Sequence, residues 1–270
     1  MRCIKVFFAA QYLQLPFMKS STCILILFSV IHFKSVCAQK EKKRIFEISA
    51  GAIAANCLSK SGVFSSLPFS GTGWGDILTA TCRKDRTVNE FSAHYATGQL
   101  RHSSADIKIR KHYSAFDYAY LYNLNSSANT GWHVEAGGSI NIIYSENVYP
   151  AIVNNKPTID CAGSVAGAVA VRYSWNRFLR GLSVSNVICV PVISAIQQPS
   201  YSAEASSKTK FTSACFGSFV RIVNTVKASA PTDQRGRLFI AYRFDYYNYH
   251  NKTVSRQAFH GLEAGYTIIL

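Results

Sequence analysis

The sequence predicts an all-β protein: an antiparallel transmembrane β-barrel of about ten strands, with eight or twelve strands as alternatives. The last nine residues place one set of side chains on one face of a strand and a second set on the other: Leu262, Ala264, Tyr266, Ile268 and Leu270 against Glu263, Gly265 and Thr267. Segments with the same alternation recur along the chain between turn residues. An alternating strand that runs to the final residue is typical of barrels that span the outer membrane.

The N-terminal segment has the order of a secretory signal peptide. Residues 22–31 are apolar, Lys19 precedes them, and Val36 and Ala38 occupy the two small-residue positions before a cleavage site. A transmembrane helix needs about 20 apolar residues, and neither this run nor any later one is that long. We therefore expect residues 1–38 to be a signal peptide, with Met18 as an alternative start, and residues 39–270 to form a single outer-membrane barrel domain. Export would then deliver the chain to the cell outer membrane.

The net charge indicates the kind of partner. The chain carries +15, and loss of the leader removes four cations and no acid, which leaves +11. An exported chain rarely meets nucleic acid, so we expect the counter-charge to be outer-membrane lipid headgroups and the phosphates of lipopolysaccharide. The basic run at residues 40–44 lies just before the first expected strand, where contact with a leaflet surface is one interpretation, but we favour a solvated N-terminus. The sequence identifies no protein partner.

The cysteines do not form a disulfide framework. Five follow the leader, an odd number without tight spacing: Cys57, Cys82, Cys161, Cys189 and Cys215. We interpret most of them as small apolar residues of the barrel wall. Cys37 would suit a lipoprotein signal, but its neighbours Val36 and Lys34 fit that cleavage poorly. The sequence has no motif for a metal or a cofactor, and we expect neither.

Ten strands follow from the alternation. We expect them at residues 44–55, 76–84, 87–97, 107–122, 131–145, 161–175, 181–194, 211–225, 236–248 and 257–269. The connections after odd strands include long ones, at 57–75 and 195–210, whereas those after even strands are tight or hydrophilic, at 84–86 and 227–235. Long connections on one side and short ones on the other, with both termini on the short side, are the outer-membrane pattern.

Alternation within single strands assigns the two faces. On the fifth strand, Trp132, Ile140 and Ile142 share one phase, and His133 and Glu135 share the other. On the ninth strand, aromatic and aliphatic residues alternate in the same way with Arg237, Arg243 and Asp245. We expect the apolar phase to face lipid, the polar phase to face the lumen, and tyrosines and tryptophans at strand ends to form aromatic girdles.

The fourth strand is the exception to this pattern. Lys108 and Arg110 share a phase with Tyr118, Tyr120 and Tyr122. Either a bulge switches the faces within this strand, or its outer half projects beyond the membrane.

Three segments resemble small outer-membrane barrels of the Bacteroidetes type: the signal that ends at Ala38-Gln39, the penultimate strand RLFIAYRFDYYNY (237–249) and the closing GLEAGYTII (261–269). Residues 182–201, with Pro191 in mid-strand, are similar to the same group. The chain departs from these proteins in ending with Leu270 instead of Phe. Many such barrels have no assigned activity, so the resemblance implies a fold and a location and not a function.

Charged and polar residues of the inward phase form the candidate site. The set is Glu47, Glu90, His94, His133, Glu135, Asn141, Arg172, Arg221, Arg243, Asp245 and Glu263. Acids and arginines occur in similar number, which predicts a paired network that fills a narrow lumen, because an unpaired buried charge is costly.

We therefore expect a non-enzymatic barrel with a structural, binding or narrow-transport role. Two alternatives stay open. One is a lipid-modifying enzyme that uses His94, with Ser92 and Glu90 nearby, or His133 with Glu135. His260 and Glu263 fall on opposite faces and make a poor pair. The other alternative is a small-solute channel.

Overall fold

The computed structural model describes residues 44–61, 65–103, 107–125, 131–149, 158–175, 181–197, 211–215, 218–250 and 254–270. The expected signal peptide, the basic run before Arg44, most of the expected connection at 195–210 and several other loop residues lie outside these ranges. None of the described residues forms a helix long and apolar enough to cross a bilayer.

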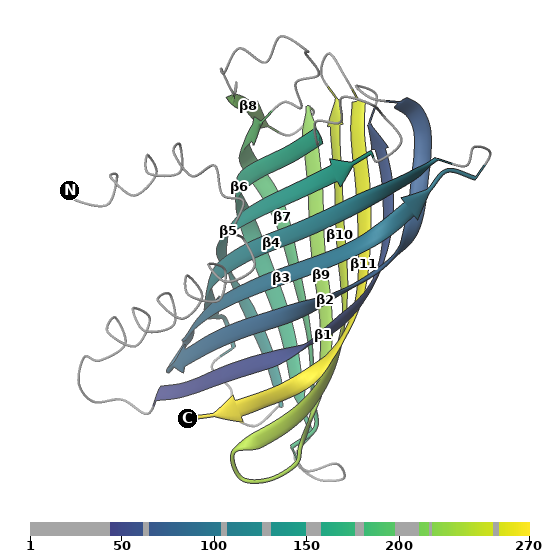
Figure 1. Ribbon diagram of the computed structural model, residues 1–270. Coiled ribbons are helices and arrows are strands. Elements are labelled where there is room, and N and C mark those ends of the chain that lie inside the picture. Colours follow the sequence, from purple (N-terminus) through teal and green to yellow (C-terminus); the bar gives the residue numbers. More distant parts are fainter. Residues whose placement is uncertain are drawn as a thin grey trace, which may run out of the picture. The chain divides into compact units, whose positions relative to one another are not determined.

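The described residues form an all-β antiparallel closed barrel, as the sequence predicted. Its strands are β1 Arg44–Ser61, β2 Ser65–Lys84, β3 Thr87–Arg101, β4 Lys108–Asn123, β5 Trp132–Val148, β6 Thr158–Ser174, β7 Ser183–Gln197, β8 Phe211–Cys215, β9 Phe219–Pro231, β10 Gly236–His250 and β11 Val254–Ile269. Neighbours in chain order pair from β1 to β8 and from β9 to β11, β9 also pairs with β7, and β11 pairs with β1 to close the wall (Figure 1).

The eighth wall position is shared by two segments. β9 pairs with β7 over Ser183–Cys189, and the short β8 pairs with β7 over Ile193–Gln197. Between them β7 contains Pro191 and a register shift against β6. Proline has no N–H for the ladder and is tolerated at such irregularities. The expected strand 211–225 is thus divided in two, and the barrel still has ten strands around its circumference.

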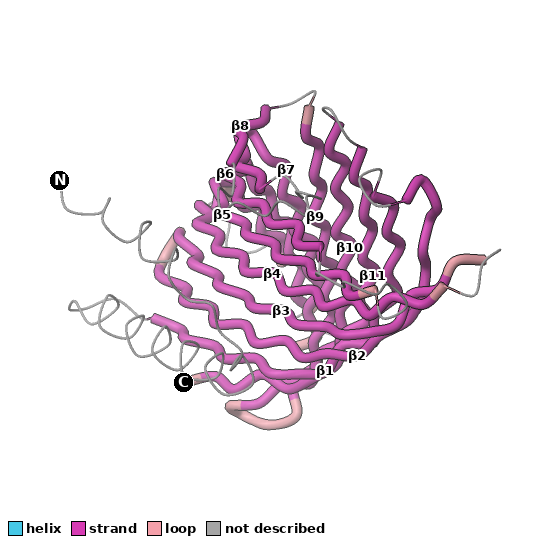
Figure 2. The backbone as a smooth tube through the Cα atoms, turned by 45° about the horizontal axis from the view of Figure 1, so that its top comes forward, coloured by secondary structure: helices cyan, strands magenta, loops and turns pink. Residues whose placement is uncertain are grey.

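We call the end of the barrel where β1 begins and β11 ends the proximal end, and the opposite end the distal end. In the tube view the strands run obliquely between the two ends (Figure 2). The proximal connections span residues 85–86, 124–131, 175–182 and 232–235. The tight turn at Asp85 was predicted. Asp85 has a positive φ of 49°, a conformation that short polar residues tolerate in turns.

The expected long connection at residues 57–75 is wrong. β1 continues to Ser61 and β2 already begins at Ser65, so this hairpin is tight. The glycines of β2 had suggested a loop, but they lie within the sheet. A Cβ at Gly71 or Gly75 would collide with the carbonyl oxygens of Gln99 and Tyr95 on β3, so close approach of the two strands requires glycine there. The expected difference in length between the connections at the two ends of the barrel is therefore smaller than the sequence predicted.

The fourth strand is regular. β4 keeps one register with β3 and with β5 from Arg110 to Tyr122, so it contains no bulge. Lys108 and Arg110 therefore share the outer face with Tyr118, Tyr120 and Tyr122, at the opposite end of the strand. The bulge interpretation is wrong, and the outer face of β4 is basic at its distal end.

The outer face of the wall is apolar. Large exposed side chains occur on most strands, among them Ile140, Val165, Ile188, Leu238, Ile240 and Leu262. Ile140 and Ile240 are 49% and 53% exposed, whereas their neighbours Asn141 and Ala241 are buried. The aromatic ring of Tyr173 contacts both Trp132 and Trp175 near the proximal end.

Candidate functional site

The lumen contains every residue of the predicted set. Glu47, Glu90, His94, His133, Glu135, Asn141, Arg172, Arg221, Arg243, Asp245 and Glu263 all lie on the inward-facing phase of their strands. They belong to two groups at different depths. One crosses the middle of the lumen, and the other surrounds a cavity at the proximal end.

The middle group is an ion-pair layer built on two arginines and two aspartates. Arg221 donates from Nε and Nη2 to the two oxygens of Asp245, at 3.0 and 2.6 Å. Arg243 Nη2 donates to Asp117 Oδ2 at 2.7 Å and lies 3.3 Å from Asp245 Oδ2. Arg221 is 0% exposed and Arg243 2% exposed, so these ions are removed from water and held by charge-assisted hydrogen bonds.

Neutral side chains complete this layer. Tyr113 donates its hydroxyl hydrogen to Asp245 Oδ2 at 2.6 Å. Asn141 Nδ2 donates to Asp117 Oδ1 at 2.8 Å, and Ser139 donates to Asn141 Oδ1 at 3.2 Å. Both aspartates therefore accept hydrogen bonds from neutral as well as charged donors, which compensates their burial.

The layer spans the full width of the barrel. β4, which carries Asp117, and β10, which carries Arg243, are five positions apart in the ring of ten strands and so lie opposite each other. The hydrogen bond between them crosses the lumen. Asp117 was missing from the predicted set because the phase of the fourth strand was ambiguous, although Asp117 does alternate with Phe116 and Tyr118.

A second polar layer lies on the distal side of the first. Lys111 Nζ donates to Gln257 Oε1 at 2.5 Å, and Gln257 Nε2 donates to Asp160 Oδ2 at 2.6 Å. Tyr247 donates its hydroxyl hydrogen to the same Asp160 oxygen at 3.2 Å. Between the layers, the rings of Tyr113 and Phe259 stack with centroids 4.2 Å apart.

Apolar side chains close the distal part of the lumen. Phe69, Leu100, Ile109, Tyr149, Phe219 and Tyr249 are buried there in one cluster. Ion pairs, polar contacts and apolar packing thus succeed one another along the axis. Close packing of this kind leaves few voids as large as a water molecule.

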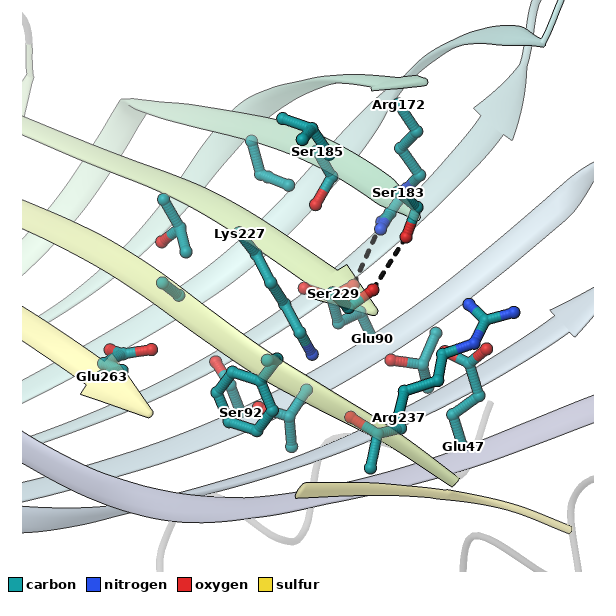
Figure 3. Close-up of a pocket in the computed structure, with 18 of the residues that line it drawn as sticks. Glu47, Glu90, Ser92, Arg172, Ser183, Ser185, Lys227, Ser229, Arg237 and Glu263 are labelled. Carbon is teal, nitrogen blue, oxygen red and sulfur yellow. Dashed lines mark hydrogen bonds and ion pairs between the residues drawn. The ribbon is translucent and has the colours of Figure 1, made fainter. Parts of the chain in front are cut away.

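The proximal end holds a cavity of about 280 Å³ (Figure 3). Arg172 contacts two acids on its wall, Glu135 Oε2 at 3.0 Å and Glu90 Oε2 at 3.1 Å. Arg83 lies 3.7 Å from Glu135 Oε1 and 4.0 Å from Glu47 Oε2. These contacts form an acid–arginine chain around one side of the cavity, and the sequence had predicted all of its members except Arg83.

Ser92, His94 and Glu263 come together between the cavity and the ion-pair layer. His94 Nε2 lies 3.2 Å from Ser92 Oγ, and His94 Nδ1 lies 3.2 Å from Glu263 Oε1. The second contact is close but misaligned, because neither of its atoms has a hydrogen-bond partner among the described residues. Sequence reasoning placed Ser92 beside His94 and did not bring Glu263 to them.

Arg243 limits what this trio can do chemically. Its Nη1 lies 3.1 Å from His94 Nε2, and a guanidinium can only donate. The Nε2 lone pair therefore accepts from Arg243, which assigns the imidazole proton to Nδ1, facing Glu263. A general base for Ser92 would need the same lone pair.

The other sequence candidates do not assemble. His133 Nδ1 lies 3.2 Å from Asn123 Nδ2, while Glu135 is held by arginines. His260 lies on the outer face, where its Nδ1 is 2.6 Å from the hydroxyl oxygen of Tyr242. The five described cysteines are free thiols. No group of His, Cys, Asp and Glu suited to a metal occurs within the described ranges.

The fold is that of outer-membrane β-barrels. Neither a protein-family model nor a curated protein matches the sequence. Among solved structures, the outer membrane protease OmpT from Escherichia coli matches with a TM-score of 0.50 and 6% identity, over 84% of this chain and 96% of that one. An identity this low indicates a shared fold alone.

Two further solved barrels match less closely. Neisserial surface protein A matches with a TM-score of 0.37 and 9% identity, over 83% of this chain and 96% of that one. The translocator domain of the autotransporter NalP from Neisseria meningitidis matches with a TM-score of 0.40 and 8% identity, over 92% and 97%.

Proposed function

We propose that the chain is an integral outer-membrane protein whose lumen is closed by its own side chains, with a structural or binding role and no enzymatic activity. The apolar outer face supports the membrane location, because soluble monomers rarely expose apolar patches larger than a few hundred Å². The resemblance to Bacteroidetes-type barrels of unassigned function belongs to the same proposal.

The observation that carries the closed lumen is the hydrogen bond between Arg243 and Asp117. It joins opposite strands at 2.7 Å, and Arg221 and Asp245 fill the space beside it. An open channel needs a continuous water path, and buried bidentate ion pairs are costly to separate. We therefore favour the closed barrel over the small-solute channel.

Conductance in a planar bilayer tests this proposal. The refolded protein should give no stable channel of large conductance, whereas Asp117→Ala/Arg243→Ala should raise the open probability, because it removes both ends of the bond across the lumen. A matched double variant on the outer face, Thr72→Ala/Tyr120→Ala, should behave like the wild type. A large stable conductance from the wild type would establish a channel.

Mobility on a denaturing gel tests the barrel itself. The unboiled protein should migrate anomalously and shift on heating, because a closed barrel has no free edge strand at which unfolding can start. Extraction into buffer without detergent, as a soluble monomer, would contradict the membrane proposal.

A second candidate function is hydrolysis of lipid esters by Ser92, His94 and Glu263. Their proximity favours it, and the contact of Arg243 with His94 opposes it. Mass analysis of lipid A, with and without the protein, decides between the two. A changed acyl pattern that is lost in His94→Ala would establish an enzyme.

The basic distal rim suggests the lipid partner. Lys60 and Arg256 pair directly across β1 and β11 on the outer face. Like charges directly opposite each other destabilise a sheet, so a counter-anion is expected between them. We propose that lipopolysaccharide phosphates supply it. Lys60→Ser/Arg256→Ser should then reduce co-purification of lipopolysaccharide, and an unchanged amount would count against this partner.

A further inference from the structure

We propose that the proximal cavity is a binding site for a small oxyanion, a carboxylate or a phosphate, with Lys227 as its central contact and Arg237 at its mouth. This inference goes beyond the closed barrel and does not depend on the membrane location. It follows from how the charges on the cavity wall are distributed.

Two of the three acids that line the cavity already have cationic partners. Arg172 holds Glu90 at 3.1 Å, and Arg83 lies 4.0 Å from Glu47. The third acid, Glu263, faces His94 at 3.2 Å. Glu90 and Glu47 therefore pair with arginines of other strands, Glu263 lies against His94, and none of the three forms an ion pair with Lys227 or Arg237.

Lys227 is such an additional cation. It lies on β9 opposite Ala241 and points into the cavity (Figure 3). Its Nζ donates to Ser49 Oγ at 3.2 Å and lies 4.3 Å from the ring centroid of Phe239. The carboxylates of Glu90, Glu47 and Glu263 act on it only from a longer range. No acid of the described chain lies within 4.0 Å, so a half-buried ammonium has only a hydroxyl and a ring as partners.

Arg237 and a pair of serines extend the site toward the mouth. Arg237 lies near the start of β10, where it pairs with Pro231 at the end of β9, and its side chain lines the cavity without an acidic partner among the described residues. Ser183 Oγ and Ser229 Oγ lie 2.8 Å apart on the same wall (Figure 3). Ammonium, guanidinium and hydroxyl donors around one space are the groups that bind oxyanions.

The size of the cavity limits the ligand. About 280 Å³ is slightly below the range of about 300–1,000 Å³ that drug-sized ligands occupy. The ion-pair layer forms the floor, so a longer chain cannot pass through. A small organic acid or phosphate that enters from the proximal end fits these limits.

Calorimetric titration of the detergent-solubilised full chain tests the inference. The probes are inorganic phosphate and succinate, at constant ionic strength so that screening does not change between points. Binding of phosphate alone, of succinate alone or of both supports the site and identifies the preferred oxyanion. Lys227→Met should weaken binding at least about tenfold, because it removes a charge-assisted contact, and Lys227→Arg should restore most of it.

The control is Arg235→Met, which removes an exposed cation from the turn beside the cavity. This variant should bind within about twofold of the wild type, a difference well below 1 kcal/mol. If neither probe binds at a concentration of about 10 mM, the dissociation constant for each is well above about 1 mM, and the inference is overturned. An equal loss in Arg235→Met and Lys227→Met would also overturn it. Heat-dependent gel mobility confirms that each variant is folded, and these failures would leave the closed barrel untouched.

Discussion

The ion-pair layer and the proximal cavity both contain buried or half-buried cations, but the cations of the layer are paired with acids and Lys227 of the cavity is not. In the layer, Arg221 and Arg243 both lie within hydrogen-bond distance of Asp245, Arg243 also contacts Asp117, and almost no water reaches the two arginines. In the cavity, Lys227 has no acid within 4.0 Å among the described residues and faces open space. Paired charges close the lumen, whereas an unpaired charge leaves a place for a ligand. The two regions should therefore respond differently to loss of a charge.

The largest expected effect is in the ion-pair layer. Asp245→Leu removes the acceptor of both Arg221 hydrogen bonds and should lower the free energy of unfolding by about 3–5 kcal/mol, the cost of a buried ion left without its partner. Urea titration, followed by tryptophan emission, measures it. Asp245→Leu/Arg221→Met should recover most of the loss. A double variant as unstable as the single one would show that the pair is not what stabilises this layer.

The next effect tests the outer face against the inner one. Ile140→Arg, at the middle of β5, should cost about 2–4 kcal/mol because the charge would face lipid at the bilayer midplane. Val148→Arg, at the end of the same strand, should cost about 0–1 kcal/mol. Refolding titrations into lipid vesicles compare the two. Equal costs would mean that the proposed lipid-facing band is misplaced.

Most of this architecture could be predicted from the sequence, because polar and apolar side chains alternate residue by residue in a strand that has one polar and one apolar face. The closing strand and the inward phase of Arg243 and Asp245 followed in this way. The β1–β2 hairpin was not predicted because a segment with glycines such as Gly71 and Gly75 is typical of a loop. In the structure, close approach to β3 requires these glycines. Periodicity alone cannot distinguish these two uses of glycine.

The partners within the lumen could not be predicted. The bond between Arg243 and Asp117 joins residues 126 positions apart in the chain, and that between Lys111 and Gln257 joins residues 146 apart. Alternation assigns a face, but contact across the lumen depends on strand tilt and register around the whole ring. The trio of Ser92, His94 and Glu263 was incomplete for the same reason.

A smaller effect should distinguish the cavity from the ion-pair layer directly. Lys227→Met should change the free energy of unfolding by less than about 1 kcal/mol without added anion, because it removes a cation that no acid neutralises. The same urea titration as for Asp245→Leu measures it. A loss as large as that of Asp245→Leu would mean that Lys227 is part of a stabilising network and not a free ligand contact.

The smallest effect concerns the acid–arginine chain of the cavity. Glu90→Gln releases Arg172 from one of its two carboxylates and should strengthen binding of phosphate or succinate by about two- to fivefold, roughly 0.4–1 kcal/mol. The control is Glu146→Gln, which changes an acid on the outer face. Weaker oxyanion binding by Glu90→Gln would indicate that Glu90 itself contacts the ligand.

The bond between β4 and β10 also constrains the order in which the chain can mature. Asp117 is synthesised more than a hundred residues before Arg243, so a nascent chain carries this carboxylate without its partner until the last two strands are in place. Inserting a half-built sheet into lipid would leave both its edges and its inward acids uncompensated. Closure of the β1–β11 seam and completion of the central ion pairs should therefore be one cooperative event, and chains that end before β10 should be left to quality-control proteases.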